Sequence, residues 1–362
     1  MGCSRGPTRP DLCGSRRNKK SQRMSAPRVT IAIPVLDEEP SIRQTLEAIC
    51  TQTMPAHEIE ILVVDGGSRD KTCLIVESIS SNEPRLRLLR NPARYQAPAL
   101  NLALKEARGE FFIRVDARTT IAADYVETCI QLLGEGRAEN VGGRMNPRGT
   151  SPMGEAISLA TSTPFGLGNS HFHYSDQEKF VDTVYLGAWR TETLRGLDGF
   201  DEQAHANEDS ELNIRLSESG GRILLSPRIH STYTPRSNWA ALRHQYLRYG
   251  RWRAYTLWKH PASMKWRQLV PPLFLAALMV TASLGVFLPL AASACYLLIA
   301  SYCSLVVVAA MITAFPSSTA HLGRLLIIFP TIHLFWGAGV WWNSLRFATG
   351  QPRPARCPIC RP

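Results

Sequence analysis

Residues 268–323 contain no Asp, Glu, Lys or Arg, an uninterrupted stretch of 56 residues. One membrane-spanning helix needs about 20 predominantly apolar residues, so this stretch is long enough for two spans, near 269–290 and 293–314. A third candidate runs from Leu325 to Leu345 and contains the interfacial pair Trp341-Trp342. We therefore expect a membrane anchor of two to three spans over 268–346, followed by a basic tail over 347–362.

The number of spans decides on which side of the membrane this tail lies. Three full spans would place the Arg-rich tail on the far side of the membrane, against the tendency of basic segments to remain cytoplasmic. Either one apolar segment does not cross fully, or the tail departs from this tendency.

Charge is unevenly distributed along the rest of the chain. The last acidic residue is Glu218, so any carboxylate chemistry belongs to the first 218 residues. Eight Lys or Arg lie in residues 1–30, which we expect to begin with a disordered basic extension over 1–27, and eight more lie in 236–267. The pI near 9.4 is compatible with nucleic-acid binding. Because the second basic block directly precedes the apolar stretch, an anionic membrane surface is the better partner, and we expect no nucleic acid.

The first half of the chain alternates short apolar runs with helical patterns. The pattern predicts buried strands over 29–36, 58–64, 86–89 and 111–115 and helices over 41–53, 70–81 and 96–108. Such alternation is typical of an α/β domain with a parallel sheet covered on both faces, which we place at 28–235. Ligands of these sheets bind outside the carboxyl ends of the strands. Asp37, Asp65 and Asp116 each follow such an end.

The second half of this domain is less regular. Residues 146–180 are rich in Gly, Ser, Thr and Pro and predict a long loop with a short helix near 153–160. A fifth strand is predicted before that loop, over 139–145. Regular structure returns over 181–235, with a predicted helix at 208–219 and a strand near 222–226. Between this domain and the anchor, aromatic residues and arginines interleave at helical spacing over 238–258. This pattern predicts an amphipathic helix in the plane of the membrane interface, within a basic region over 236–267.

Five short motifs appear in a characteristic order. They are Ile33-Pro34-Val35-Leu36-Asp37-Glu38, Val64-Asp65-Gly66-Gly67-Ser68-Arg69-Asp70, Arg114-Val115-Asp116-Ala117-Arg118, Gly199-Phe200-Asp201-Glu202 and Asn207-Glu208-Asp209. Together they resemble the inverting family 2 glycosyltransferases, whose GT-A fold is a Rossmann-like nucleotide-sugar-binding domain. The resemblance covers about residues 28–255. The stretch 91–101, with Tyr249-Gly250-Arg251 and the C-terminal spans, is most similar to the succinoglycan-type glucosyltransferases of bacterial exopolysaccharide assembly.

On the donor side, the resemblance implies a pocket for the nucleotide sugar. Asp65 would accept a hydrogen bond from the base, and Gly66 would keep the turn open beside it. Pro34 and Asp37 would line the base and ribose, and Asn101 is a further candidate for nucleotide-sugar binding. The structural alternative for Asp65 is an Asp-Gly turn that caps the helix beginning near residue 70.

Asp116 is the candidate metal ligand. A nucleoside-diphosphate leaving group carries concentrated negative charge, which a hard divalent cation on a carboxylate neutralises. The resemblance implies Mg²⁺ or Mn²⁺, with a second ligand two residues further on. This chain has Arg118 at that position. Either Asp116 alone anchors the metal together with phosphate and water, or Arg118 contacts the phosphate directly.

Asp209 is the candidate general base. An acceptor hydroxyl must lose its proton as it attacks the anomeric carbon, and a carboxylate within hydrogen-bond reach can take that proton. By resemblance, Glu208 and Asp209 open a helix on the acceptor side, with Asp209 as the base and Glu208 as a structural or acceptor-binding residue. The structural alternative is capping of that helix by Asp209.

Gln245-Tyr-Leu-Arg248-Tyr249 resembles the QxxRW signature, with Tyr in place of Trp. By resemblance Gln245 and Arg248 would contact acceptor or diphosphate, although a basic aromatic helix at the interface explains the same pattern. The small number of predicted spans argues against a processive synthase, which would need a translocation channel.

These patterns predict a membrane-associated inverting glycosyltransferase of the inner (plasma) membrane, with its catalytic domain cytoplasmic. The expected donor is UDP-glucose, and the expected acceptor is a polyprenyl-linked saccharide or another glycolipid used in exopolysaccharide or cell-envelope glycan synthesis. Two alternatives stay open: a processive polysaccharide synthase, and a non-catalytic nucleotide-sugar-binding membrane protein.

Overall fold

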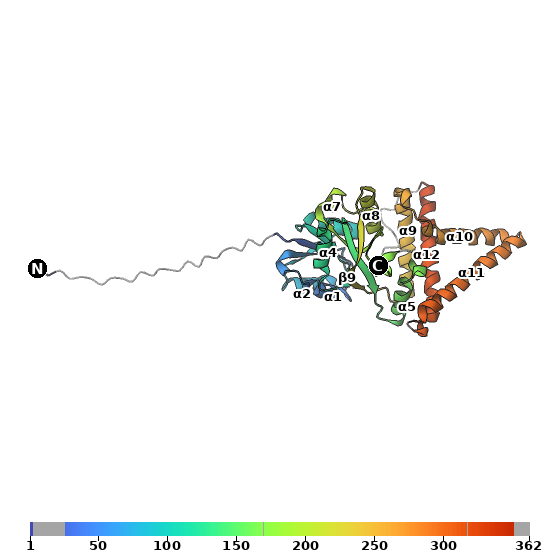
Figure 1. Cartoon of the computed structure of the whole chain (residues 1–362), viewed down its shortest axis with the longest axis horizontal. Helices are drawn as coiled ribbons and strands as arrows, with labels where there is room; N and C mark the ends of the chain where they lie inside the picture. The colour runs from blue at the N-terminus through green and yellow to red at the C-terminus, as the bar shows by residue number, and fades with distance from the viewer. Residues whose placement is uncertain (3–25, 169, 317, 351–362) are drawn as a thin grey trace.

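The structure is a computed structural model that describes residues 1–2, 26–168, 170–316 and 318–350. Most of the predicted basic extension over 1–27, and the predicted tail from residue 351 onward, lie outside the described residues. Figure 1 shows an α/β domain joined to a set of long helices at its C-terminal end.

One mixed sheet organises the α/β domain. Its strands within the described chain follow the order β3-β2-β1-β4-β8-β6-β9-β5, and β7 pairs with β9. The strands are β1 (Val29–Val35), β2 (Ile59–Asp65), β3 (Leu86–Arg90), β4 (Phe111–Arg114), β5 (Thr119–Ile121), β6 (Asn140–Pro147), β7 (Lys179–Phe180), β8 (Tyr185–Arg190) and β9 (Ile223–Tyr233). The expected α/β class is confirmed.

Helices cover both faces of this sheet, because the residues of each strand alternate between two apolar cores. Val29, Ile31 and Ile33 pack under α1, α2 and α4, whereas Ala32 packs under α3, α7 and α8. The helices of the domain are α1 (Ile42–Cys50), α2 (Thr72–Ser80), α3 (Gln96–Glu106), α4 (Tyr125–Gly134), α5 (Pro152–Thr161), α6 (Pro164–Leu167), α7 (Thr191–Gly196) and α8 (Glu208–Glu218), with 3-10 turns η1 (Ala56–Glu58) and η2 (His171–His173).

The predicted parallel sheet is confirmed for the first four strands, and the sheet is mixed beyond β4. Strands β3, β2, β1 and β4 are parallel, but β8 runs antiparallel to both β4 and β6. The physical reason is the connection between β6 and β8. Residues 148–184 form this connection and do not return the chain to the end of the sheet at which β6 begins, so β8 runs in the opposite direction. This connection is also more ordered than predicted, since it contains α5, α6, η2 and β7.

Four long helices follow the α/β domain within the described residues. They are α9 (Trp239–Lys259), α10 (Trp266–Gly285), α11 (Pro289–Ala314) and α12 (Leu322–Ala348), with short 3-10 turns η3 (Pro261–Ser263) and η4 (Thr319–His321) between them. The last three fall where the spans were predicted, and each is long and apolar enough to cross a membrane. Figure 1 shows α12 beside α9, while α10 and α11 lead away from this pair and meet at a distant tip.

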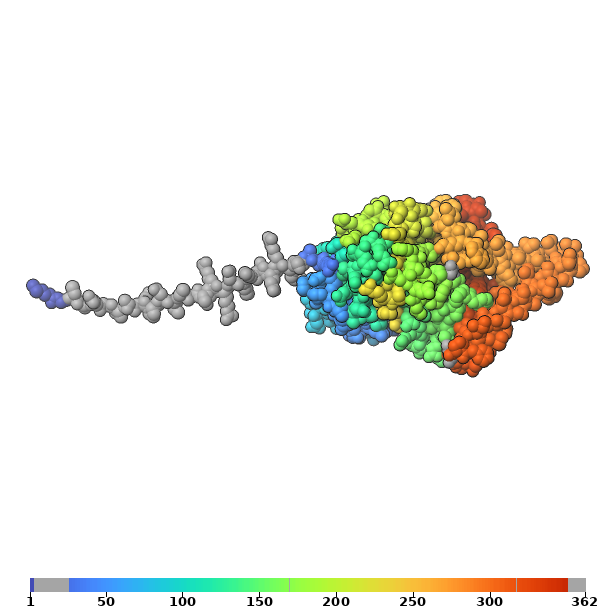
Figure 2. Space-filling model, in the orientation of Figure 1, coloured from blue at the N-terminus to red at the C-terminus, as the bar shows by residue number. Residues whose placement is uncertain are grey.

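The three apolar helices differ in how much of their surface the protein covers. Only 6% and 11% of the most apolar windows of α10 and α11 are buried, against 39% for α12. Figure 2 shows the α10–α11 hairpin projecting from the body of the molecule. α12 instead packs on α5, α9 and α11 through the buried side chains of Ile328, Phe329 and Ile332.

Helix α9 is enclosed by protein to a greater extent than an interface helix requires. Arg251, Trp252 and Tyr255 are each less than 7% exposed. Glycine permits this close approach of α9 to α12, because a Cβ at Gly250 would lie 2.0 Å from the carbonyl oxygen of Trp336. The aromatic and basic residues predicted to face lipid headgroups therefore form, in large part, the contact between the α/β domain and α12.

Candidate active site

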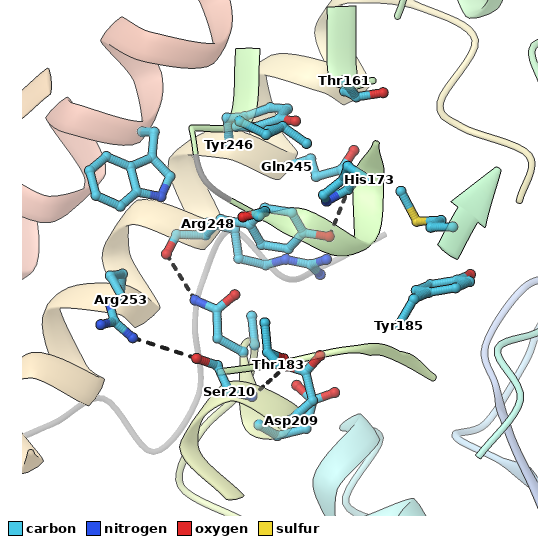
Figure 3. Close-up of a pocket in the computed structure, with 18 of the residues that line it drawn as sticks. Thr161, His173, Thr183, Tyr185, Asp209, Ser210, Gln245, Tyr246, Arg248 and Arg253 are labelled. Atoms are coloured by element: carbon cyan, nitrogen blue, oxygen red, sulfur yellow. Dashed lines mark hydrogen bonds between the residues drawn. The ribbon is translucent and has the colours of Figure 1, made fainter. Parts of the chain in front are cut away.

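A large cavity extends from the α/β domain to the apolar helices. It encloses about 2690 Å³ and begins at the carboxyl ends of β1 and β4, where Pro34 and Asp116 line it. It continues past Asp209 on α8 and Arg248 on α9, and ends between α10, α11 and α12, where Tyr302 is one lining residue. Figure 3 shows the central part, in which side chains from α8 and α9 point toward one another.

Asp65 lies at the end of β2 and is fully buried. Its carboxylate accepts hydrogen bonds from the backbone N–H groups of Gly67 and Ser68, at 3.0 Å each, and from Arg90 at 2.9 Å. Burial acts to raise the pKa of Asp65, but hydrogen bonds from Ser68 and Arg90 outweigh it and lower the pKa below the ordinary value. The carboxylate is therefore ionised, and it shapes the loop that presents Gly66 to the cavity.

Asp37 performs a similar task in the loop after β1. Its Oδ1 accepts from the N–H of Arg69 at 2.7 Å, and its own N–H donates to the Ser68 hydroxyl at 2.9 Å. Pro34 and Gly66 line the cavity, whereas Asp37 and Asp65 lie just behind its lining. The structure thus brings the four predicted residues together, with the two acids holding adjacent loops in place.

Asn101 lies apart from the cavity lining. Its amide donates to the Phe200 carbonyl at 2.8 Å and to Glu202 at 3.0 Å, and its Oδ1 accepts from the Phe200 N–H at 2.8 Å. The side chain therefore fastens α3 to the turn at Gly199, where the backbone adopts φ +67°. This placement favours a structural role for Asn101 over a direct contact with the nucleotide sugar.

Asp116 follows β4 and lines the cavity beside Arg114. Its Oδ1 accepts from Arg114 Nε at 2.9 Å and from Gln96 Nε2 at 3.0 Å, while its Oδ2 makes a longer contact with Arg114, at 3.3 Å. Arg114 also places Nη1 3.0 Å from Glu208 Oε1. One arginine therefore joins the candidate metal ligand to the helix that carries the candidate base.

This arginine is buried, and its environment explains its charge. Burial acts to lower the pKa of Arg114, but the carboxylates of Asp116, Glu208 and Asp209 raise it above the ordinary value. Glu208 is 3% exposed, and burial raises its pKa while Arg114 opposes that rise. Glu208 therefore serves as the buried counterion of Arg114.

Asp209 lies in the first turn of α8 and lines the cavity. Asn207 precedes the helix in the left-handed conformation, at φ +60°, and its side-chain amide donates to the Tyr249 carbonyl at 3.1 Å. Asn207 makes no side-chain capping bond; Asp209 Oδ1 accepts from the Ser210 N–H at 2.7 Å. The Asp209 carboxylate therefore lies at the N-terminal end of a helix and faces the cavity, as a group that contacts an acceptor hydroxyl must.

Arg118 lines the cavity and lies against Glu38, with its Nε 3.0 and 2.8 Å from the two carboxylate oxygens. Arg236 lies near it, and burial together with Arg118 lowers the pKa of Arg236 below the ordinary value. Arg118 thus occupies the position at which the resemblance implies a second metal ligand, and a second cation, Arg236, lies near it. Both suit an anionic ligand.

Gln245 and Arg248 lie one turn apart on α9, and both line the cavity. Gln245 donates to the Tyr249 hydroxyl at 2.9 Å, and the Arg248 guanidinium lies 5.8 Å from the Tyr249 ring centroid. Within the described chain, the buried Arg248 Nε has no hydrogen-bond partner. Figure 3 shows this guanidinium extending into the cavity above Asp209. An anion is the natural complement of such a group.

Arg114, Arg236 and Arg253 are among the cavity arginines that were not assigned a role from the sequence. The position of Arg114 carried a usable signal, since residues two apart near the end of a strand share one face, and Asp116 was already a candidate. In the sequence, Arg236 and Arg253 are recognisable only as members of a basic segment. That both line the same cavity depends on how this segment and α9 pack against the α/β domain.

Comparisons with known proteins agree with this geometry. Residues 30–174 match the family described as "Glycosyl transferase family 2". The chain is 29% identical over 333 residues to the succinoglycan biosynthesis protein ExoA of Rhizobium meliloti (strain 1021), covering 88% of this chain and 95% of the relative. It is 30% identical over 230 residues to a dolichyl N-acetyl-alpha-D-glucosaminyl phosphate 3-beta-D-2,3-diacetamido-2,3-dideoxy-beta-D-glucuronosyltransferase of Methanococcus voltae, covering 61% of this chain and 71% of the relative.

Among solved structures, a mannosyltransferase from Pyrobaculum calidifontis, in complex with GDP-Man and Mn²⁺, has a similar fold. The TM-score is 0.56 at 23% sequence identity, and the match covers 88% of this chain and 87% of that chain. This likeness supports the predicted GT-A-like fold.

Proposed function

Because this chain belongs to glycosyl transferase family 2, we propose that it moves a hexose, with glucose as the first candidate, from a nucleoside-diphosphate donor to a lipid-linked saccharide. The product would serve exopolysaccharide or cell-envelope glycan synthesis. Similarity to the succinoglycan biosynthesis protein supports the polysaccharide context. The name of the Methanococcus voltae relative specifies a dolichyl-phosphate-linked sugar, which supports a lipid-linked acceptor.

One observation carries the proposal: Asp116 and Asp209 line the same cavity, and Arg114 with Glu208 connects them. In an inverting displacement the base and the leaving group act from opposite sides of the anomeric carbon. Asp209 would take the proton of the attacking acceptor hydroxyl. The leaving diphosphate would lie toward Asp116, with Arg118, Arg236 and Arg248 as charged neighbours.

A divalent cation, Mg²⁺ or Mn²⁺, fits this arrangement when the donor supplies most of its ligands. Among the described residues no three His, Cys, Asp or Glu side chains form a ready cation site. Asp116 Oδ2, whose nearest hydrogen-bond contact is 3.3 Å, could provide one oxygen. Mg²⁺ is commonly held by one or two carboxylates plus substrate phosphates. Such a cation would neutralise charge on the leaving diphosphate.

The base and ribose of the donor would occupy the pocket bordered by Pro34 and Gly66. Asp37 and Asp65 would support this pocket by holding the loops in place. For Asp65 to accept a hydrogen bond from a base N–H, one of its present hydrogen bonds, such as that from Arg90, would have to break. UDP is the first candidate for the nucleotide by resemblance, and the sugar would extend from it toward Asp209.

We also propose that the enzyme is a multi-pass protein of the inner membrane with its catalytic domain cytoplasmic. The exposed apolar hairpin of α10 and α11 would enter the bilayer, while α12 would remain beside α9 near the cytoplasmic surface. This arrangement would leave the basic C-terminal segment on the cytoplasmic side, in agreement with the positive-inside tendency. A reporter domain fused after Thr349 should then be accessible to protease only in membranes whose cytoplasmic face is exposed.

The decisive experiment measures nucleotide release and sugar transfer by purified membranes that contain the wild type or Asp209→Asn, with UDP-glucose, a lipid extract and Mg²⁺ or Mn²⁺. We expect transfer by the wild type and a loss of at least about 100-fold in the variant, with donor binding retained. Donor binding without transfer from any common nucleotide sugar would favour the binding-protein alternative. Long polymer made on single acceptors would favour the processive synthase.

A further inference from the structure

A second group of cations lies where the cavity leaves the α/β domain. Arg253, Lys265 and Arg267 line this part of the cavity, next to the first turn of α10. Lys265 forms an ion pair with Asp182, and Arg267 Nη2 lies 3.7 Å from the same carboxylate. Lys265 and Arg267 therefore share one carboxylate, and the N-terminal end of the 20-residue α10 adds partial positive charge.

Arg253 is the unusual member of this group. It is 7% exposed, yet no carboxylate of the described chain pairs with it, and its Nε has no hydrogen-bond partner there. Its Nη2 donates to the Ser263 carbonyl at 2.9 Å and to Gln268 Oε1 at 2.8 Å. Burial lowers the pKa of Arg253 to about 10. A buried, uncompensated guanidinium that faces a cavity is a site for an anion.

This group is close to the candidate base but separate from the cations of the donor end. Arg253 Nη1 contacts the hydroxyl of Ser210, the residue after Asp209, at 3.5 Å. Figure 3 shows Arg253 reaching Ser210 from α9, whereas Arg248 enters the cavity at another level of the same helix. An anion bound at Arg253 would therefore place its attached group beside Asp209.

Beyond Arg253 the cavity lining becomes largely apolar, with Ser301, Tyr302 and His333 among its polar side chains. Its lining passes to Phe274 of α10, Leu298 and Leu305 of α11, and Ile332 and Trp336 of α12. These three helices enclose the space into which the cavity continues, and Figure 1 shows α10 and α11 extending away from the α/β domain. The outer surfaces of α10 and α11 are exposed and apolar, as for helices in contact with lipid tails.

We propose that Arg253, Lys265 and Arg267 bind the diphosphate of a long-chain isoprenoid carrier lipid, and that its hydrocarbon tail lies among α10, α11 and α12. This inference rests on the proposed function and names the subsite of its acceptor. The cation group supplies the charge for a diphosphate, and the apolar continuation distinguishes a lipid from free diphosphate. The saccharide attached to the diphosphate would then reach Asp209.

The test is equilibrium binding of decaprenyl diphosphate to the purified full-length protein in detergent. Arg253→Gln and Arg267→Gln should each weaken binding by about tenfold or more, since a hydrogen bond to a charged group contributes about 1.5–3 kcal/mol. Arg243→Gln is the matched control: Arg243 is also on α9, but it lies over the Trp239 and Phe335 rings and does not line the cavity. Its binding should stay within about twofold of the wild type, well short of that tenfold change.

Wild-type affinity in both Arg253→Gln and Arg267→Gln would overturn the proposal. If Arg253→Gln lowers the melting temperature enough to obscure its binding, Arg267→Gln decides the question, because this side chain is 22% exposed and tolerates replacement better. Inorganic diphosphate that competes as well as decaprenyl diphosphate would overturn the lipid assignment. Arginine-dependent lipid binding by a protein that transfers no sugar would uphold this subsite and reject the proposed reaction.

Discussion

The guanidinium of Arg114 lies 3.0 Å from the carboxylate of Glu208, and both side chains are at least nine-tenths buried. Arg114 ends β4 and Glu208 begins α8, so this ion pair joins the two elements that present Asp116 and Asp209 to the cavity. The relative position of donor and acceptor groups therefore depends on a charge pair inside the protein.

Replacement of Arg114 by Met should destabilise the protein by about 3–5 kcal/mol, because Glu208 and Asp116 lose their shared counterion in a buried setting. Chemical denaturation or thermal melting of the purified protein measures this change. Arg190→Met, which removes an exposed pair with Glu110, is the control and should cost less than about 1 kcal/mol. Equal destabilisation by the two replacements would contradict the role assigned to the buried pair.

Activity should depend on a divalent cation through Asp116. Chelation should abolish nucleotide release, and Mg²⁺ or Mn²⁺ should restore it. In Asp116→Asn the half-saturating metal concentration should rise by at least about tenfold, since even residues that only orient a metal ligand affect affinity by about 10–100-fold. A wild-type enzyme that is indifferent to chelator would show that cations of the protein alone neutralise the diphosphate.

Arg118 should act on the donor more than on the fold. Arg118→Gln should raise the KM for the nucleotide sugar by about tenfold, the effect of one lost charge-assisted hydrogen bond. Glu38→Gln removes the partner of Arg118 but leaves the cation in the cavity. Its effect on KM should be much smaller. Steady-state kinetics of both single variants and the double variant would show equal, non-additive effects if the Arg118–Glu38 contact itself were what mattered.

The contact between α9 and α12 should be intolerant of any side chain at Gly250. A Cβ there would lie 2.0 Å from the Trp336 carbonyl oxygen, so Gly250→Ala should force the helices apart and cost about 1–3 kcal/mol. At Gly323, also in a helix, nothing lies within 4 Å of such a Cβ. Gly323→Ala should be neutral or slightly stabilising in the same melting experiment. A tolerated Gly250→Ala would mean that α9 and α12 are not closely packed.

Stability should fall in mildly acidic solution because of His173. This side chain is 9% exposed, and burial lowers its pKa to about 3 from the ordinary 6.5. Between these values the unfolded chain binds more protons than the folded protein, so stability is complete above about pH 6.5 and declines as pH falls toward 3. The slope approaches about 1.4 kcal/mol per pH unit. His173→Phe should flatten the dependence of the melting temperature on pH, whereas an unchanged slope would place its origin in another group.

Several features of the site could be predicted because they depend on short stretches of sequence. Asp65 and Asp116 directly follow predicted buried strands, whereas the role of Asp209 was implied by the resemblance of its motif to the family 2 glycosyltransferases. The structure places Asp116 and Asp209 on one cavity. Asn101 was predicted to bind the nucleotide sugar, but its amide donates hydrogen bonds to Phe200 and Glu202 instead. These partners lie about 100 residues further along the chain, so no local pattern could indicate them.

The sequence by itself determined the α/β class, the three apolar helices and the acids at the strand ends, because alternating or uninterrupted burial leaves a local pattern of side chains. Only the tertiary structure decided that β8 enters the sheet antiparallel, that Arg114 reaches Glu208, and that Gly250 brings α9 against α12. The uncompensated cation at Arg253 belongs to the same class. Each of these features depends on how close residues that are remote in the chain lie in the folded protein. Packing of the complete core sets these distances, and no local sequence pattern encodes them.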